Sequence, residues 1–320
     1  MTSAVMDKKV AGAGKKKKEK KQRSWLARNL LNIILTIVLV VGLGLLSYPT
    51  IASWWNSTRQ SGAVKQYVAE LEEVDTEAID AAIESAKNYN SKIVNTGGIG
   101  WKFNEEDQKA YDAELNLSGV GVMGYIEINS LDVTLPIYHG TDEAVLQQGV
   151  GHLESTSLPV GAKSWDDDKG MVTDSADGSH CVVSGHRGLP SSRLFTDLDK
   201  MKEGDTFALN IYNNLLIYEV DQIRVVLPED LSNLKLEKGQ DYCTLVTCTP
   251  YGINSHRLLV RGRRVSTLDA ERYIYRIQGN ATQIRPLIVA LLMAAPILAI
   301  LFLSVVLNPK RLMRKRKKAS

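Results

Sequence analysis

Three residues in the second half of the chain have types and positions suited to nucleophilic chemistry. Cys248 ends an apolar run typical of a strand, Cys243-Thr-Leu-Val-Thr-Cys248, and Pro250-Tyr-Gly252 predicts a turn directly after it. A side chain at the end of a strand faces a loop and is accessible, and a thiolate is strongly nucleophilic near neutral pH. Arg257 opens the next strand nine residues later, so its guanidinium can approach the thiol, favour the thiolate and supply donors to a developing oxyanion.

A base is also required, and the sequence offers two histidines for this role. His186 follows a short apolar strand in the loop Ser184-Gly-His-Arg-Gly-Leu-Pro190, where the glycines permit a tight turn. His256 is adjacent to Arg257, but neighbouring strand residues point to opposite faces, so only one of these two can face Cys248. This parity argument favours His186. Each residue alone has an ordinary explanation as a buried thiol, an exposed imidazole or a solvated guanidinium, so only the joint pattern indicates a site.

The other two of the three cysteines have a related spacing. Cys181 lies five residues before His186, and Cys243 lies five residues before Cys248. If the two strands are parallel neighbours with the histidine and the nucleophile level, the two cysteines are level as well. Neighbouring strands are about 4.8 Å apart, within the range of disulfide Cα separations. The spacing predicts a disulfide or a close pair of thiols, with two unrelated buried cysteines as the alternative.

Short strands and turns dominate the chain from Gly119 onward. The predicted strands are Val120–Ile128, Val133–Tyr138, Cys181–Ser184, Thr206–Tyr212, Leu215–Val226, Tyr242–Thr247 and Leu258–Arg263. Apolar residues recur at helical spacing over 61–95, where a second helical piece is expected to start at Thr76, and acidic residues mark 163–179 as an exposed loop. Several short strands with few helices predict a mainly β domain, either a closed barrel or a sandwich.

Charge is unevenly distributed along the 320 residues. Residues 1–28 carry ten Lys/Arg and two acids, residues 308–320 carry seven Lys/Arg and no acid, and the part between them has a net charge of −12 although the whole chain is +3. The folded part is therefore acidic, which excludes a basic nucleic-acid-binding domain. Each tail adjoins an uncharged apolar run, Leu30–Tyr48 or Pro286–Leu307, that reaches about 28 Å or about 33 Å as a helix and can cross a membrane.

Both apolar runs are predicted to be uncleaved membrane spans. The first is longer than the apolar part of a signal peptide and lacks a good cleavage site, which disfavours removal. The second is followed by Arg314-Lys-Arg-Lys-Lys318, which disfavours a buried core helix. Positive-inside bias then predicts a two-pass protein of the cell membrane, anchored in the lipid bilayer by both spans, with both tails cytoplasmic and residues 49–285 outside.

Longer stretches of the chain resemble the sortases, the cysteine transpeptidases of Gram-positive surfaces. The resemblance rests on Thr244-Leu-Val-Thr-Cys248 with Arg257 nine residues later, on Ser184–Pro190 around His186, and on blocks typical of class C, the pilin-polymerising branch. These blocks are Gly121–Ile128, Leu135–Gly140, Gly149–Glu154, Leu194–Asp199 and Thr247–Arg264. The second anchor after the domain also fits class C.

The resemblance implies a sortase-type closed β-barrel with N-terminal helices, flanked by two transmembrane helices. In such an enzyme Cys248 attacks the Thr–Gly bond of an LPxTG-like sorting signal on a pilin or surface protein, and the amine of a pilin Lys resolves the thioester as an isopeptide bond. His186 is expected to act as general acid and then base, Arg257 to orient substrate and stabilise the oxyanion, and Thr247 to bind substrate. No cofactor or metal is expected, since the acidic run Asp166–Asp168 lacks the spacing of a calcium loop.

These inferences divide the chain into seven parts. They are a basic cytoplasmic tail (1–28), a transmembrane helix (29–48), an extracellular helical and lid region (49–118), the catalytic barrel (119–265), a linker (266–285), a second transmembrane helix (286–307) and a second basic tail (308–320).

The chain departs from the class C pattern at the lid. Class C sortases often carry an Asp-Pro-aromatic motif whose Asp meets the catalytic Arg and whose ring covers the Cys. The corresponding place here is Trp101-Lys-Phe103, which offers Trp101 or Phe103 as the ring but has no Asp-Pro pair, and its Lys would repel Arg257. We therefore expect any lid to be held weakly, with a mobile linker as the alternative. Two other functions stay open: a sortase that uses a cell-wall-precursor amine, and a non-catalytic pilus assembly scaffold.

Overall fold

The computed structural model describes residues 25–96, 99, 103–117, 121–212, 214–267, 295–296 and 299–300. The chain divides into two compact units, residues 1–45 with 291–320 and residues 46–290. The second unit contains the candidate nucleophile, histidine and arginine, and helix α1 runs from the first unit into the second.

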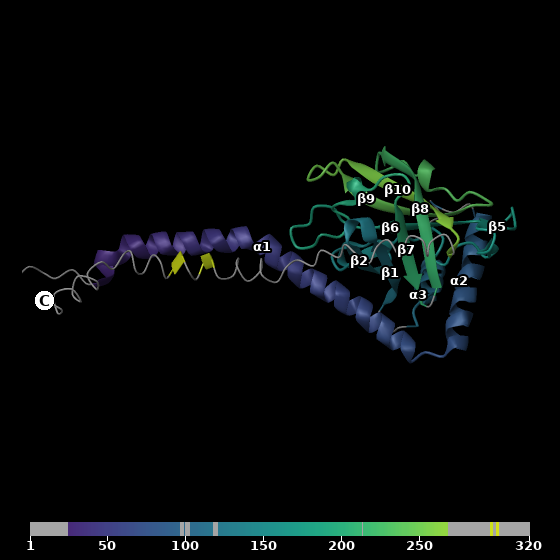
Figure 1. Ribbon diagram of the computed structural model, residues 1–320, viewed down its shortest axis with the longest axis horizontal. Coiled ribbons are helices and arrows are strands. Elements are labelled where there is room, and N and C mark those ends of the chain that lie inside the picture. The colour runs from purple at the N-terminus through teal and green to yellow at the C-terminus, as the bar shows by residue number, and fades with distance from the viewer. Residues whose placement is uncertain are drawn as a thin grey trace, which may run out of the picture. The chain divides into compact units, whose positions relative to one another are not determined.

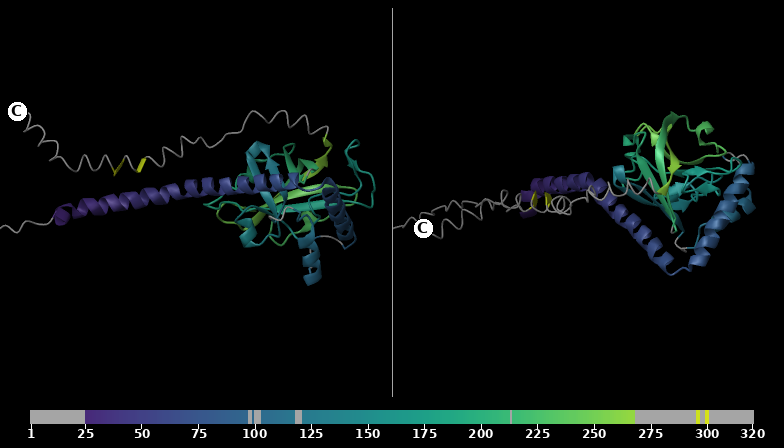
Figure 2. Two further views of the ribbon diagram at one scale, coloured as in Figure 1. Left: turned by 90° about the horizontal axis from the view of Figure 1, so that it is seen from below. Right: turned by 45° about the vertical axis from the view of Figure 1, so that its right-hand side comes forward.

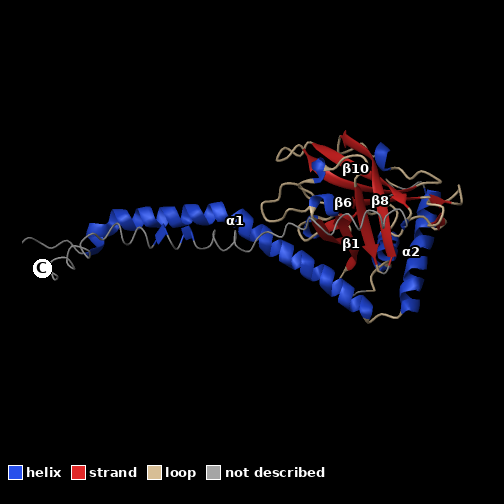
Figure 3. Cartoon of the chain, viewed as in Figure 1, coloured by secondary structure: helices blue, strands red, loops and turns tan. Residues whose placement is uncertain are grey.

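Eight strands of the described part form a closed barrel in the order β1-β2-β3-β6-β9-β10-β8-β7 (Figures 1 and 3). They are β1 (Val122–Ile128), β2 (Val133–His139), β3 (Val150–His152), β6 (Ser179–Ser184), β7 (Thr206–Ile211), β8 (Asn214–Val226), β9 (Asp241–Thr249) and β10 (His256–Val265). A separate hairpin pairs β4 (Trp165–Asp166) with β5 (Met171–Val172). The prediction of a mainly β, closed barrel is confirmed, and closure removes the unpaired edges that an open sheet exposes.

Strand register places two cysteines side by side in the barrel wall. β6 runs parallel to β9, with Cys181 opposite Cys243 and Ser184 opposite Val246. Both cysteines are fully buried in the main core. Val182 and Val246 pack in a smaller cluster, because alternate residues of a strand point to opposite faces. The level arrangement predicted from the equal five-residue spacings is therefore confirmed.

Two N-terminal helices lie against the barrel. The helices α1 (Trp25–Glu72) and α2 (Thr76–Thr96) are joined by residues 73–75. The C-terminal half of α1 lies on one side of this turn and α2 on the other, and both are beside the barrel (Figures 1 and 2). The hydroxyl of Tyr67 on α1 donates to Met123 O at 3.1 Å and accepts from Tyr212 N at 2.6 Å. The other helical elements are short: α3 (Glu105–Ala113), α4 (Glu143–Leu146), and the 3-10 turns η1 (Asn129–Leu131), η2 (Leu198–Lys200) and η3 (Ser232–Leu234).

Helix α1 is much longer than the periodicity predicted. The helix begins at Trp25, well before the expected helix over 61–95, and continues through Pro49 to Glu72. The first apolar run and the segment after it therefore form one helix. A proline removes one helical hydrogen bond, a loss that a long apolar helix can tolerate. The expected second piece starting at Thr76 is confirmed as α2.

Among the described residues, α1 is the one helix with an apolar stretch long enough to cross a membrane, within Ile33–Glu72. Its length and composition fit a membrane anchor or a signal sequence. The predicted second span, 286–307, and the predicted linker, 266–285, lie almost entirely outside the described residues.

Three strands were not predicted from the sequence. β3 has three residues with Gly151 in the middle, and β4 and β5 have two residues each inside the expected exposed loop 163–179. Strands this short cannot display the alternation that identifies a strand. Gly151 is required where it is, because a Cβ there would collide with the carbonyl oxygen of Gly140.

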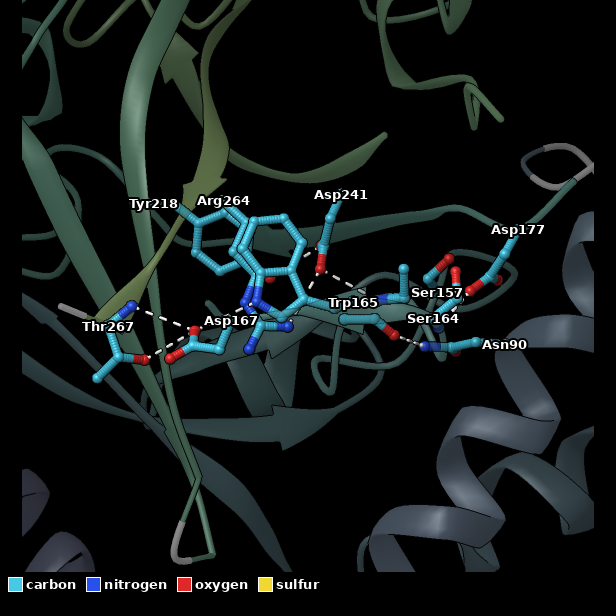
Figure 4. Close-up of polar contacts among 12 residues, drawn as sticks. Asn90, Ser157, Ser164, Trp165, Asp167, Asp177, Tyr218, Asp241, Arg264 and Thr267 are labelled. Atoms are coloured by element: carbon cyan, nitrogen blue, oxygen red, sulfur yellow. Dashed lines mark hydrogen bonds and ion pairs between the residues drawn. The ribbon is translucent and has the colours of Figure 1, made fainter. Parts of the chain in front are cut away.

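A buried ion pair lies where β9 begins and β10 ends (Figure 4). Asp241 Oδ2 is 3.2 Å from Arg264 Nη1 and accepts from Ala162 N at 3.1 Å. Tyr218 donates to Asp241 Oδ1 at 3.3 Å. Arg264 also stacks 4.6 Å from the centroid of the Trp165 ring. Burial raises the pKa of the Asp241 carboxyl, while Arg264 acts in the opposite direction.

Further polar contacts connect this end of the barrel with its surroundings (Figure 4). Both the backbone N and the hydroxyl of Thr267 donate to Asp167 Oδ1, at 3.2 and 3.0 Å. Asn90 of α2 donates to Leu158 O and Gly161 O. The chain that leaves the barrel after β10 is thus fixed at its first residues, at the opposite end of β9 from Cys248.

Candidate active site

Cys248 and Arg257 are cross-strand partners. β10 runs antiparallel to β9, with Arg257 opposite Cys248 and His256 opposite Thr249. Directly opposed residues project from the same face of a sheet, so Arg257 shares the face of Cys248 and His256 does not. Arg257 Nη1 donates to the carbonyl oxygen of His256 at 3.1 Å, which holds the guanidinium at the loop after β9. The parity prediction for this pair is therefore confirmed.

His186 is brought to the same level by the ladder between β6 and β9. Ser184 is opposite Val246, and Gly185 N donates to Val246 O at 3.0 Å, so the pairing continues past the end of the assigned strand. His186 and Cys248 each lie two residues beyond this last pair, so both candidates come at the same end of two neighbouring parallel strands. His186 is 22% exposed at its side chain, accessible yet held.

Thr247 fastens the two strand ends to each other. Its hydroxyl is buried and donates to the carbonyl oxygen of Gly185 at 2.7 Å. Gly185 must be a glycine, because a Cβ would lie 2.8 Å from the ring of Phe195. The Thr247 hydroxyl is used for this backbone contact, and a direct role in substrate binding stays a prediction.

A carboxylate that the sequence did not single out faces the imidazole. Glu143, the first residue of α4, has Oε2 3.2 Å from His186 Nε2. This distance is short enough for an ion pair. The two groups are not aligned for a hydrogen bond, and Nε2 makes no hydrogen bond with the described residues. A hydrogen bond from Gln147 and the nearby charge of His186 lower the pKa of Glu143, so it is ionised at neutral pH. Glu143 is suited to orienting the ring.

Arg187 ties the loop after β6 to the end of β9. Its Nη1 donates to Thr249 Oγ1 at 3.0 Å and its Nη2 donates to Asp199 Oδ2 at 2.6 Å. Gly188 in the same loop has φ +78°, and a Cβ there would lie 3.0 Å from the ring of Tyr251. The two loops that carry the candidate residues are therefore packed and bonded to each other.

An apolar groove adjoins the Cys248 face. A cavity of about 210 Å³ lies among β6, β9, β10 and the connection from β8 to β9. Its lining is mostly apolar and includes Val182, Val246, Leu231, Leu234, Leu259 and Arg257. Arg257 belongs both to the groove and to the cross-strand pair with Cys248, so the groove and the candidate nucleophile are neighbours on this face.

Cys181 and Cys243 are free thiols, as is Cys248. Of the two arrangements expected for the pair, a disulfide or close thiols, the structure has free thiols opposite each other on neighbouring strands. Burial raises the pKa of Cys243 well above its usual value, which keeps that thiol protonated. Both lie in the barrel core and not on the Cys248 face.

Of the two lid candidates, Trp101 lies outside the described residues. Phe103 is half-buried and packs edge-on against Tyr111 of α3, with ring centroids 5.8 Å apart. Whether either ring covers Cys248 stays a prediction.

Known proteins are similar to this chain in sequence and in fold. A sortase domain model matches residues 126–265. The crystal structure of sortase C1 from Streptococcus agalactiae is 46% identical with a TM-score of 0.57, covering 63% of this chain and 97% of that chain. Sortase C of Clostridium perfringens, solved with the C-terminal cell wall sorting motif, is 40% identical with a TM-score of 0.53, covering 64% and 99%. Sortase D of Bacillus subtilis is 27% identical over 166 residues, 51% of this chain and 74% of that protein.

The closed barrel carries a cysteine, an arginine and a histidine at one end of its strands. The chain belongs to the sortase family, whose members are cysteine transpeptidases. This chain covers nearly the whole length of the structural neighbours named sortase C.

Proposed function

We propose that this chain is a class C sortase that polymerises pilins. One observation carries the proposal: Cys248 and Arg257 are paired on one sheet face beside an apolar groove, and His186 follows the neighbouring strand β6 at the same end of the barrel. The likeness to sortase C from two organisms supports it, one of these being the structure with a C-terminal cell wall sorting motif.

In the first step, the groove holds an LPxTG-like signal and the Cys248 thiolate attacks the carbonyl carbon of its Thr. The tetrahedral intermediate carries an oxyanion, which Arg257 stabilises because a guanidinium does not lose its proton. The His186 imidazolium gives a proton to the Gly amine as the Thr–Gly bond breaks. The products are a thioester on Cys248 and a neutral imidazole.

In the second step, the ε-amine of a pilin Lys attacks the thioester while neutral His186 takes a proton from it. The isopeptide bond forms, the Cys248 thiolate leaves, and the imidazolium is regenerated for the next cycle. Glu143 keeps the ring oriented through both transfers, since its carboxylate lies 3.2 Å from Nε2.

We also propose that two membrane spans hold the enzyme at the cell membrane with the barrel outside. The apolar length within α1 supports the first span, and the uncharged run 286–307 followed by seven Lys/Arg supports the second. Secreted substrates with membrane-retained tails would then meet the groove at the surface.

A sortase that attaches proteins to a cell-wall-precursor amine is the alternative. It would share every step up to the thioester and differ only in the acceptor. Its support is the similarity to proteins named sortase A, such as the 31% identity over 134 residues with that of Staphylococcus aureus.

The full chain in lipid nanodiscs, incubated with an LPxTG-type peptide, tests the first step. We expect mass spectrometry to find the truncated peptide as a thioester on Cys248, and Cys248→Ala to abolish it. His186→Ala should lower the rate by roughly 100-fold or more, whereas its matched control, His256→Ala, should retain the rate within about three-fold. Equal losses from both histidine variants would contradict the assignment of the acid–base role to His186.

Adding a pilin and a cell-wall-precursor amine together tests the acceptor. Isopeptide crosslinks between pilin subunits are expected, and transfer to the precursor in preference would favour the alternative. Pilus polymerisation that continues in the Cys248→Ala variant would instead support a scaffold without catalysis.

A further inference from the structure

One face of helix α1 contacts the barrel through two kinds of residue, polar amides and apolar side chains, and this face is called the stripe below. Beyond Leu46, the residues that are buried against the barrel or bonded to it recur at helical spacing: Asn56, Gln60, Tyr67 and Leu71. Tyr67 and Leu71 belong to the apolar core, whereas Asn56 and Gln60 make contact through side-chain amides. Apolar packing is enough to seat a helix, but a buried amide is costly unless its donors are satisfied and it fixes position by direction.

The Gln60 amide bridges two segments that are far apart in sequence. Its Nε2 donates to Ser192 Oγ at 3.0 Å and to Gln148 O at 3.1 Å. Gln60 is 7% exposed and Ser192 is 2% exposed, so the bond between them is shielded from bulk water, and the bond to Gln148 O is partly buried. One turn earlier, Asn56 Nδ2 donates to Ser191 O at 2.8 Å.

The two bridged segments carry the groups that meet at the imidazole. Ser192 lies in the loop that begins at His186, and the loop returns to it through the bond from Phe195 N to His186 O at 3.2 Å. Gln148 lies two residues after the short helix α4, whose first residue, Glu143, lies 3.2 Å from His186 Nε2. A single amide on α1 is thus bonded to both sides of the Glu143–His186 contact.

We propose that Gln60, assisted by Asn56, is a positioning residue that sets the spacing between Glu143 and His186 for the transfer reaction. The catalytic part rests on the proposed function, while the spacing is a property of the fold. Gln60 acts through the loop after β6 and the segment after α4, without touching substrate. Proton transfer to and from His186 needs hydrogen-bond distances, so a displacement of about 1 Å is enough to slow it strongly.

Gln60→Met in the full chain in lipid nanodiscs tests the proposal, because it keeps the length of the side chain and removes both donors. We expect kcat for thioester formation to fall about ten-fold with KM unchanged, since the groove is not altered. The matched control is Tyr67→Phe, which removes the bonds to Met123 and Tyr212 from the same stripe. It should lower stability and leave kcat unchanged.

Combining Gln60→Met with Glu143→Gln tests whether Gln60 acts through Glu143. The double variant is expected to lose little more than the stronger single variant, because both changes disrupt the same contact. Losses that multiply fully would overturn that route.

Hydrogen exchange supplies a readout that needs no activity. The amide of Phe195 should exchange roughly ten-fold faster in Gln60→Met and at the wild-type rate in Tyr67→Phe. If the wild type forms no thioester but exchange differs in this way, the proposed function fails and the positioning stands. Wild-type exchange together with wild-type kcat in Gln60→Met overturns the inference. If Gln60→Met does not fold, Asn56→Ala, which removes only the bond to Ser191, is measured by the same two readouts, and wild-type values there overturn it.

Discussion

Arg187 carries a charge that is almost hidden from solvent, with 8% of its side chain exposed. Its guanidinium donates to Thr249, the residue after the nucleophile, and to Asp199. Arg193 in the same loop has an ion pair of the same 2.6 Å length with Asp197, but 49% of its side chain is exposed. Burial is what separates the two arginines, since water screens an exposed pair.

We expect Arg187→Ala to lower the free energy of unfolding by about 2 kcal/mol, the usual loss for a charge-assisted hydrogen bond. Arg193→Ala, the matched control, should lower it by less than about 1 kcal/mol. Urea unfolding of the full chain in detergent measures both. Equal losses would mean that burial of Arg187 adds nothing to its bonds.

At the residue scale, spacing along the sequence predicted Cys248, Arg257 and His186 because each lies at the end of a strand whose register is simple to infer. Glu143 and Gln60 could not be found in this way. Glu143 reaches His186 from 43 residues earlier through α4, and Gln60 reaches Ser192 across 132 residues. Contacts between loops depend on chain paths that no local pattern encodes.

His180 on β6 connects the strand pair β6–β9 to the segment that follows the groove-lining turn η3. Its Nδ1 lies 2.8 Å from Lys235 O and its Nε2 lies 2.7 Å from Thr244 Oγ1. Since a carbonyl oxygen only accepts, Nδ1 donates to Lys235 and Nε2 accepts from Thr244. Lys235 follows η3, whose Leu234 lines the groove. Burial lowers the pKa of His180 to about 4. The hydrogen bond to Lys235 raises this pKa, and the nearby charge of Arg261 lowers it further.

We expect this element to lose stability in acid. The His180 pKa is lower in the folded chain than the ordinary 6.5 of the unfolded chain, so its contribution is complete above pH 6.5 and is lost as pH falls toward 4. The full loss amounts to about 3 kcal/mol. His180→Gln retains a donor and an acceptor and does not titrate, so its unfolding free energy should fall less between pH 6.5 and 4. Parallel curves for the two proteins would show that His180 is not buried as a neutral ring.

At the scale of elements, the strands of six or more residues were predicted within a few residues of their ends. The difference between prediction and structure is largest in α1. Its N-terminal half is apolar all round and has no amphipathic period, whereas its C-terminal half has one. Periodicity therefore identified only the half that packs against the barrel through Tyr67 and Leu71. A uniformly apolar helix is recognised by length instead.

For the whole barrel, the buried pair of Asp241 and Arg264 closes the end opposite Cys248. Because burial raises the Asp241 pKa above its unfolded value, the stability that comes from its bound proton is present below pH 3.8 and is lost as pH rises through the folded pKa. Asp241→Asn removes this titration. We expect the wild type to lose stability relative to Asp241→Asn as pH rises from 4 to 7, measured by urea unfolding of the full chain. A wild-type advantage that grows with pH would mean that Arg264 outweighs burial.

Charge and apolar length argue for the arrangement of the whole molecule about the membrane. The tails carry net charges of +8 and +7 and the part between them −12, and Lys and Arg near a span are retained on the cytoplasmic side. In a Cys248→Ala background, single cysteines at Thr2, Ser320 and Ile253 can be labelled with an impermeant maleimide on cells without their wall. Ile253, with 72% of its surface exposed on the barrel, should be labelled at once.

Thr2→Cys and Ser320→Cys should react only after the membrane is lysed, because the positive-inside rule predicts that both tails lie inside. The buried thiols of Cys181 and Cys243 serve as the internal blank, since the parent Cys248→Ala protein should take no label while folded. Labelling of Ser320→Cys on intact cells would mean that the run 286–307 does not cross the bilayer. The barrel would then be tethered by α1 alone, and the seven basic residues after that run would need another partner, such as the anionic outer surface of the membrane.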